Sequence, residues 1–373
     1  MKKLLLSLAL LASLSLDAQF VTTLAKNATE SQTDGVVYYL PRNVIRLEFT
    51  VEEIDYCVGP YSEFTTQMLG ETDYIKENKT EVNIKNVDIQ TITEIDPTAA
   101  YIIAPDEKSK EPIPSIVLSD EGILVAMGYD NIPAGCQVEH KSFNDNDLQD
   151  TERVEASFIE ILDSEIDLDD DDDDDDDEGD NEKEVVVKES RPAKTISMED
   201  KAKAALEKIN AIRNAYFELI SGSQEVAYGS TTKYMANNLK ALENEYVSLF
   251  KGKIVKNVYK KVIYVTPENS LLNASLPIGK VSDKGENVKI QFDSQISSKN
   301  IKPTSYEVKN SAQTNKVFYR IPYTSNVKII SGSTVIAEKV LIISQFGDIR
   351  PISIKNGKAL FNPNTGQILR LER

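Results

Sequence analysis

Short β-type runs separated by turn residues fill the last third of the chain, from Lys253 to Arg373. The runs KVFYRIP, NVKII, STVIAEKVLIIS and GQILRLER are rich in β-branched and aromatic residues, and SDKGEN, SGS, KNG and NPNTG are turn signals. Runs and turns at this spacing are typical of an antiparallel sandwich or barrel. Residues 253–373 are therefore predicted to form a β-sandwich-like C-terminal domain.

A second set of β-type runs precedes them. In VIRLEFTVEE the apolar residues Ile45, Leu47, Phe49 and Val51 alternate with polar ones, which predicts a half-buried strand. The runs VNIKNVDIQTITEI, AAYIIAP and GILVAMG follow, and GPYSEFTTQMLG predicts a short helix between two glycines. A polar segment at 19–34 thus leads into an N-terminal β domain at 35–140 that contains one short helix.

The segment 197–252 has the pattern of two amphipathic helices. Ser197 is a candidate N-cap, and Asp200 three residues later completes a capping-box-like start. Apolar residues then recur at helical spacing on two stripes: Leu206, Ile209, Ile212, Tyr216 and Leu219, and after Gly222, Met235, Leu239, Leu242, Tyr246 and Leu249. We expect an antiparallel hairpin with core-facing stripes. The predicted fold class is mainly β, α+β overall: two antiparallel β domains with a two-helix hairpin between them.

The net charge of −18 is mostly local. Residues 163–184 hold sixteen acidic residues and one lysine, a net charge of −15, which leaves −3 for the rest of the chain. The folded parts are therefore close to neutral. Because no Lys/Arg-rich face is apparent, the sequence argues against nucleic-acid binding.

The acidic loop at 169–178 lies in a predicted linker at 141–196. The runs VEASFIEIL and EKEVVVKES on either side are read either as short strands or as arms packed on a neighbour. Asp169 to Asp177 offer oxygen ligands for calcium, but with Gly179 at the sixth position of an EF-hand loop, the twelfth falls on Val185 instead of Glu. Mutual repulsion favours a solvated loop. Weak divalent-cation binding and a basic partner are the alternatives.

The first eighteen residues have the layout of a signal peptide. Lys2 and Lys3 precede an apolar run from Leu4 to Leu16, and Ala18 is small enough for cleavage. The run is too short for a spanning helix, and no longer one follows, so no integral membrane span is predicted. No cysteine stands directly after the run, so we expect an exported protein of the periplasm or outer cell surface without a lipid anchor.

The two cysteines are the disulfide candidate of an exported chain. An oxidising compartment permits Cys57 and Cys136 to bond, while the alternative is two buried thiols. The sole histidine, His140, lies four residues after Cys136. A strand would hold these two side chains apart, so a catalytic pair is not expected.

Other common chemistries find little support. The chain has too few His and Cys residues for an ordinary zinc site, and it lacks the glycine-rich loops that cradle phosphates. We predict no catalytic, cofactor-binding or metal-binding residues and no cofactor, and the balance is against an enzyme. A carboxylate-dependent hydrolase remains an alternative, provided that two acidic residues outside 163–184 converge in a pocket.

Six pieces of the chain carry a resemblance to a known family: GVVYYLPRNVIRLEFTVEE, GPYSEFTTQMLG, INAIRNAYFELISGS, LENEYVSLFKGK, VFYRIPYTSNVKII and SQFGDIRPI. In this order they resemble the exported Bacteroidota proteins known only as domain of unknown function 4831. The resemblance implies a cell-envelope or secreted protein and supplies no activity, cofactor or site residues. We therefore expect a non-enzymatic binding or scaffolding module whose partner is an envelope protein or glycan, with a hydrolase and a calcium-responsive protein as alternatives.

Overall fold

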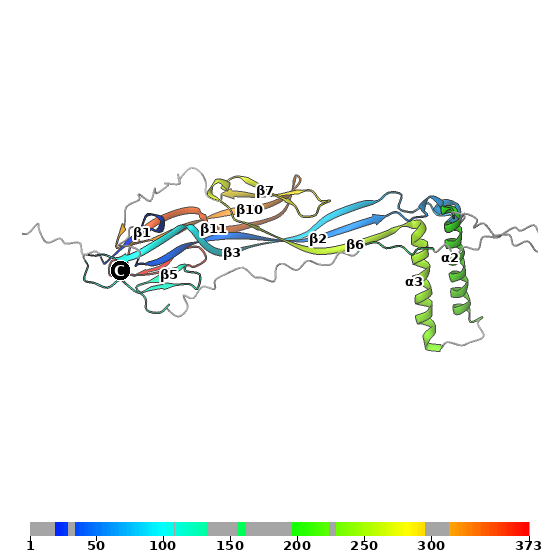
Figure 1. The fold of residues 1–373 in the computed structure, drawn as a ribbon, viewed down its shortest axis with the longest axis horizontal. Helices are drawn as coiled ribbons and strands as arrows, with labels where there is room; N and C mark the ends of the chain where they lie inside the picture. Colours follow the sequence, from blue (N-terminus) through cyan, green and yellow to red (C-terminus); the bar gives the residue numbers. More distant parts are fainter. Residues whose placement is uncertain are drawn as a thin grey trace, which may run out of the picture. The chain divides into compact units, whose positions relative to one another are not determined.

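A computed structural model describes residues 19–28, 34–107, 109–132, 155–161, 196–223, 229–294 and 313–372. The chain forms two compact units (Figure 1). Unit 1 draws on Met1–Val51, Asn83–Thr151 and Tyr259–Arg373, and unit 2 on Glu52–Val82 and Glu152–Val258. Each unit thus combines segments that are distant in the sequence, and the ranges predicted as N-terminal and C-terminal β domains both contribute to unit 1.

Three antiparallel sheets and a helical hairpin confirm the predicted mainly β, α+β fold class. The first sheet has the order β6 (Lys253–Val265), β2 (Val36–Cys57), β3 (Lys79–Pro105), β1 (Phe20–Leu24) and β9 (Gln313–Thr314). The second runs β11 (Thr334–Ser353), β10 (Lys316–Ser331), β8 (Asn287–Ser294) and β7 (Ser275–Lys280). The third runs β13 (Ile368–Glu372), β12 (Lys358–Phe361), β5 (Leu124–Met127) and β4 (Ile116–Leu118).

Strand β2 shows the alternation that the sequence predicts, but with a change of phase. Buried side chains occupy odd positions from Ile45 to Val51, as expected. Before Pro41 the buried positions are even, at Tyr38 and Leu40. Since a strand places successive side chains on opposite faces, the change of phase means that the regular pleat is interrupted between Leu40 and Ile45.

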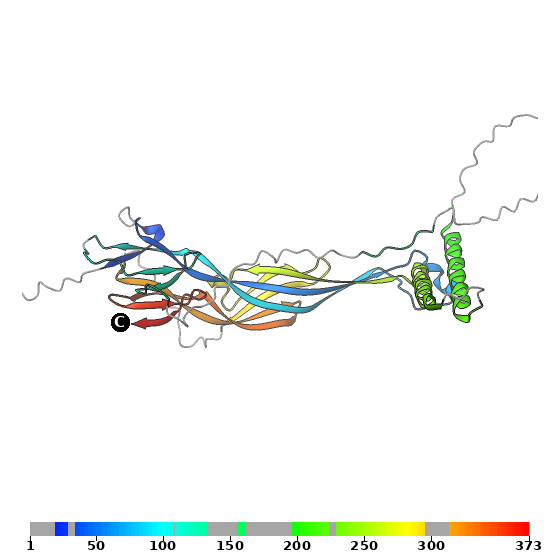
Figure 2. The ribbon, with the colours of Figure 1, turned by 90° about the horizontal axis from the view of Figure 1, so that it is seen from below.

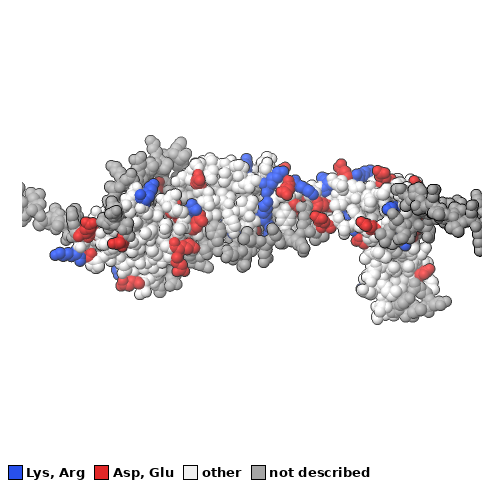
Figure 3. Space-filling view, viewed as in Figure 1, with Lys and Arg blue, Asp and Glu red and all other residues white. Residues whose placement is uncertain are grey.

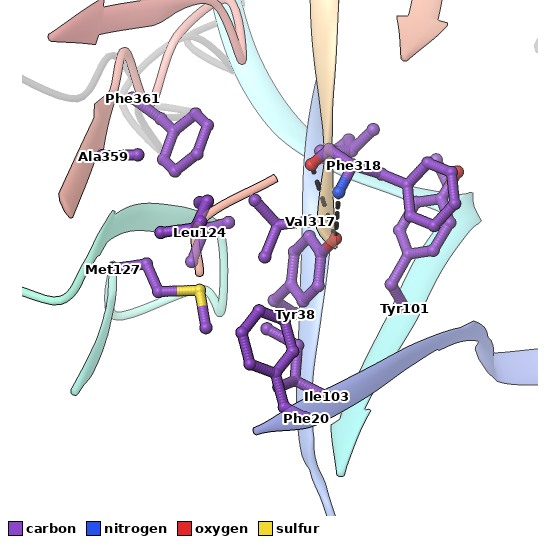
Figure 4. Close-up of a cluster of buried hydrophobic side chains, with 13 residues drawn as sticks. Phe20, Tyr38, Tyr101, Ile103, Leu124, Met127, Val317, Phe318, Ala359 and Phe361 are labelled. Atoms are coloured by element: carbon purple, nitrogen blue, oxygen red, sulfur yellow. Dashed lines mark hydrogen bonds between the residues drawn. The ribbon is translucent and has the colours of Figure 1, made fainter. Parts of the chain in front are cut away.

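The core of unit 1 is built around a stack of three aromatic rings. The ring centroids of Tyr38 and Tyr101 are 5.5 Å apart, and those of Tyr101 and Phe318 are 4.5 Å apart. The backbone N–H of Phe318 donates to the Tyr38 hydroxyl at 2.9 Å, as the dashed line in Figure 4 shows. Strands β2, β3 and β10 are therefore joined by stacked rings and by a hydrogen bond that satisfies a buried hydroxyl.

A large bulge interrupts the pairing of β10 with β11. Ile321 pairs with Asp348 and Tyr323 pairs with Ile343, so Pro322 alone lies opposite Ser344–Gly347. Proline has no N–H to donate to a ladder, which is one reason why pairing fails at this point. A Cβ atom at Gly347 would overlap the carbonyl group of Ile321 and lie 2.9 Å from the Cα atom of Pro322. Only glycine permits this close approach.

Unit 2 contains the predicted hairpin, formed by α2 (Met198–Ser221) and α3 (Thr232–Lys251). Figures 1 and 2 show the two helices side by side. The capping box at the start of α2 is present, because the Asp200 N–H donates to the Ser197 hydroxyl at 3.1 Å. Gly222 ends α2 with a left-handed φ of 70°, as its position after the apolar stripe predicts.

The base of the hairpin packs on two further segments of unit 2. Its core includes Ala202, Ala205, Ile209, Leu249 and Phe250. The predicted short helix at 59–70 consists of a 3-10 turn, η3 (Ser62–Phe64), and a π turn, η4 (Thr65–Leu69), whose side chains join that core. Residues 155–161 are an arm without strand structure that places Phe158 and Ile161 there.

Candidate functional site

A buried polar cluster lies in unit 1 where the bulge of β11 meets β2. The side chain of Asn43 accepts hydrogen bonds from the backbone N–H of Ser344 at 2.8 Å and from the Ser344 hydroxyl at 2.7 Å. Its amide nitrogen donates to the carbonyl oxygen of Asn364 at 3.0 Å. Asn43 thus supplies partners for backbone groups that the interrupted ladder leaves without strand neighbours.

Gln345 satisfies the backbone of Asn43 in return. The Asn43 N–H donates to the Gln345 side-chain oxygen at 2.9 Å, and the Gln345 amide donates to the Asn43 carbonyl at 2.7 Å and to the Pro267 carbonyl at 3.0 Å. Two side-chain amides therefore replace a stretch of ladder, and they fix the bulge to β2 and to the segment after β6.

An ion pair is buried beside this cluster. The Arg320 guanidinium of β10 donates to the carboxylate of Asp96 on β3, and these residues are only 3% and 6% exposed. The second carboxylate oxygen of Asp96 accepts from the N–H of Thr98 at 2.9 Å and from its hydroxyl at 2.6 Å. Burial lowers the pKa of Arg320, and the carboxylate of Asp96 opposes that shift. The pair is thus nearly dehydrated and depends on both partners.

The ion pair forms part of the wall of a cavity of about 580 Å³. Cavities that hold small ligands typically measure about 300–1,000 Å³. The walls come from β2, β3, β10, the bulge of β11 and the segment after β6, and they comprise Arg42, Asp96, Thr98, Thr266, Pro267, Glu268, Asn269, Leu272, Arg320, Gln345, Phe346, Gly347, Asp348 and Ile349. Charged and amide groups therefore face the same space as apolar ones, which is the composition expected of a ligand site.

Of the three acidic residues that line the cavity, Asp96, Glu268 and Asp348, Asp96 is the most fully engaged by hydrogen bonds. Both carboxylate oxygens of Asp96 are occupied by Arg320 and Thr98, so neither oxygen is available to act on a substrate. Asp348 accepts from the Arg350 guanidinium at 3.1 Å and from the Tyr323 hydroxyl at 3.4 Å. A glycosidase needs one carboxyl group as acid and a second as base or nucleophile. Asp96 is therefore suited to neither role.

The far half of the hairpin in unit 2 is a second region of interest. Its exposed apolar side chains are Phe217 (66%), Ile220 (55%), Tyr234 (70%) and Leu242 (42%). Leu242 was expected on the buried stripe but is exposed, and α3 has no buried residue before Glu243, whereas α2 keeps Ile212 and Leu219 buried beyond the base of the hairpin. The part of the hairpin that points downward in Figure 3 is largely free of charged side chains on the face shown.

Glu243 joins the two helices of the hairpin electrostatically. Its carboxylate accepts from Arg213 of α2 at 2.7 Å and from Lys240 of α3 at 2.8 Å. Hydrogen bonds from Lys240 and Arg213 hold the pKa of Glu243 below its ordinary value. No helix in the described part of the chain has the length and apolar character needed to cross a membrane.

Most of the residues considered for chemistry from the sequence lie outside the described residues. These are Cys136, His140 and the acidic run Asp169–Asp177. Cys57 is the last residue of β2, and its disulfide with Cys136 stays a prediction. In the described segments, no group of His, Cys, Asp and Glu is placed so that it could hold a metal ion. Charges of both signs are interspersed on the face in Figure 3, in keeping with near-neutral folded parts.

Sequence reasoning missed the residues of the cavity, although prolines marked their positions. Pro41 precedes Arg42 on β2, Pro97 follows Asp96 on β3, and Pro322 lies two residues after Arg320 on β10. A proline inside a long strand cannot donate to a ladder and signals an interruption. Three such prolines beside charged residues are a signal that could have located the site.

Comparison with known proteins gives a family and nothing more specific. The family model described as Domain of unknown function (DUF4831) matches residues 34–369, and the chain belongs to this family. No curated protein matches the chain, and no solved structure matches it. The matched residues include every wall of the cavity and both helices of the hairpin.

Proposed function

We propose that this DUF4831 protein is an exported, non-catalytic binding protein of the cell envelope, and that unit 1 receives a small ligand in its cavity. The observation that carries the proposal is a cavity of ligand size whose wall contains the dehydrated Asp96–Arg320 pair. Burying such a pair is costly, and a purely structural position is often filled as well by apolar side chains. Retaining it beside an open cavity supports recognition of a polar ligand.

Two observations support export. The sequence before Gln19 has the layout of a signal peptide. Gln19 itself is anchored in unit 1, where its backbone N–H donates to the Asn315 side chain at 2.7 Å and its amide donates to Asn356 at 2.9 Å. We expect the mature chain to begin at Gln19, and N-terminal sequencing of the fractionated protein checks this. Cytosolic protein that still begins at Met1 would contradict export.

Ligand binding is tested by thermal unfolding of the purified protein with a soluble envelope extract of peptides and oligosaccharides. Binding to the native state alone raises the unfolding temperature. We expect the extract to stabilise the wild type and a Leu276→Trp control, since Leu276 is outside the cavity. It should not stabilise Leu272→Trp, which fills the cavity. Equal stabilisation of both variants, or none of the wild type, refutes the proposal.

A scaffolding role is the second candidate function, and the exposed apolar residues of the hairpin favour it. A helix that is apolar outside its own core usually packs on a partner. Cross-linking in intact cells should yield the same adduct from the wild type and from an Ile254→Gln control, which alters an exposed apolar residue on β6. A Phe217→Gln, Tyr234→Gln variant should lose that adduct. An adduct that survives this variant excludes the hairpin as the contact surface.

A further inference from the structure

The guanidinium group of Arg42 lines the cavity and has N–H groups that are not used in hydrogen bonds to the described residues. Arg42 of β2 uses its Nε–H on the carboxylate of Glu94 at 2.6 Å, and its side chain is about one third exposed. Its terminal N–H groups have no hydrogen-bond partner among the described residues, and Arg42 lines the cavity. These are the atoms with which arginine binds a carboxylate through two parallel hydrogen bonds.

Arg320 adds to the positive character of the same wall. Its Nε–H is buried and has no hydrogen-bond partner in the described part of the chain. One terminal nitrogen is on Asp96, and the other reaches the Ser344 carbonyl only at 3.4 Å. Arg42 is close enough to Arg320 to add to the lowering of its pKa, after burial as the main cause. Two guanidinium groups thus line one cavity, each paired with one carboxylate and each with N–H donors that have no hydrogen-bond partner among the described residues.

The opposite charge lies on the segment after β6. Glu268 lines the cavity, and among the described residues its carboxylate accepts no hydrogen bond and forms no ion pair. Thr266 and Asn269, which lie close to Glu268 in the sequence, also line the cavity. A solvated carboxylate next to amide and hydroxyl groups is suited to an ammonium group, which donates three hydrogen bonds.

These observations assign a class of ligand to the cavity of the proposed binding protein, and the assignment rests on that proposed function. We propose that the cavity takes a zwitterion of the kind that a short peptide with free termini presents, with its carboxylate on Arg42 and its ammonium group on Glu268. Phe346, Leu272 and Ile349 supply apolar wall for the side chains of such a ligand.

Calorimetric titration with dialanine tests this assignment, because both charged ends can be blocked separately. We expect dialanine to bind the wild type at millimolar concentrations. Its C-terminal amide and its N-acetyl derivative should each bind at least about tenfold more weakly, since a hydrogen bond to a charged group is worth about 1.5–3 kcal/mol. Sodium acetate and methylammonium chloride, used separately, should not reproduce the affinity of the intact dipeptide.

Two variants assign the ends of the ligand. Arg42→Gln should weaken the binding of dialanine about tenfold but leave the affinity for the C-terminal amide unchanged. Glu268→Gln should also weaken the binding of dialanine about tenfold but leave the affinity for the N-acetyl derivative unchanged. Arg46→Gln and Glu286→Gln are matched controls outside the cavity and should bind like the wild type, with far-ultraviolet circular dichroism confirming their fold. Equal losses for blocked and free peptides overturn the assignment.

The experiments distinguish a wrong assignment of the ligand class from a wrong proposal of the binding function. If the envelope extract stabilises the wild type but dialanine binds no better than its blocked forms, the ligand is of another class and the binding function stands. If neither the extract nor any peptide binds, the proposed function fails and the assignment fails with it. Tight binding of acetate alone would replace the zwitterion with a simple carboxylate ligand.

Discussion

Replacing Asp96 by Asn removes the only counter-charge that contacts Arg320 by a hydrogen bond among the residues that the structure describes. The guanidinium is 3% exposed and cannot lose its proton, and its remaining contact is the Ser344 carbonyl at 3.4 Å. Breaking a buried pair by removing one partner destabilises a protein by about 3–5 kcal/mol. We expect Asp96→Asn to lower the free energy of unfolding of unit 1 by this amount.

Replacing Arg320 instead should lower the free energy of unfolding by less, because Asp96 retains other hydrogen-bond partners. In Arg320→Met, the Asp96 carboxylate keeps its hydrogen bonds from Thr98 at 2.9 and 2.6 Å, so we expect a loss of about 2–3 kcal/mol. The variant that carries both Asp96→Asn and Arg320→Met should be no less stable than Asp96→Asn alone. The cost of Arg320→Met then disappears once Asp96 is replaced, which corresponds to a coupling energy of about 2–3 kcal/mol between the two residues.

Urea unfolding measures all three variants. The chain has no Trp, so tyrosine circular dichroism in the near ultraviolet serves as the signal, to which the stacked Tyr38 and Tyr101 of unit 1 contribute. The midpoint should fall with little change in the dependence on urea. If Asp96→Asn costs less than about 1 kcal/mol, which is within the range of an exposed ion pair, the pair is solvated and the reasoning from its burial is wrong.

Three further predictions concern the packing and titration of both units. Burial raises the pKa of Tyr101 to about 12 from 10.0, so the stability that this residue contributes is complete below pH 10 and is lost as pH rises to 12. Urea unfolding across that range should show a smaller loss for Tyr101→Phe. Gly347→Ala should lower the free energy of unfolding by about 1–3 kcal/mol or more, measured in urea, because the new Cβ overlaps the carbonyl of Ile321. Lys240 and Arg213 lower the pKa of Glu243 from 4.5, so the hairpin keeps this contribution above pH 4.5 and loses it as pH falls through the lowered pKa. Helical circular dichroism during acid unfolding should show a weaker pH dependence for Glu243→Gln than for the wild type.

The parts of the fold that the sequence predicts well are governed by neighbours within one helix or strand. Ser197 and Asp200 form the capping box because their atoms meet one turn apart. The alternation from Ile45 to Val51 holds because strand geometry places every second side chain on one face. The exposure of Leu242 could not be foreseen, because periodicity identifies an apolar stripe but not how far along a hairpin other segments cover it.

The candidate site depends on contacts that no local pattern carries. Asn43 and Ser344 are 301 residues apart in the chain, yet the Asn43 side chain accepts hydrogen bonds from the backbone N–H and the hydroxyl of Ser344. Asp96 and Arg320 are 224 residues apart. Alternation treats a polar residue in a strand as solvent-facing, so Asn43 and Arg320 look like ordinary surface positions in the sequence. Only the sheet order brings β2, β3, β10 and β11 together.

The polar cluster and the cavity have a common structural origin. Where Pro322 faces Ser344–Gly347, backbone groups leave the ladder and need other partners. Asn43 and Gln345 supply those partners, which holds four residues of β11 away from regular pairing and brings Gln345, Phe346 and Gly347 into the wall of the cavity. If the bulge served only to relieve strain, apolar side chains could pack against it. This bulge lines the same cavity as Arg42, whose terminal N–H groups have no hydrogen-bond partner among the described residues, so the interruption of the sheet shapes a site that also contains a charged donor.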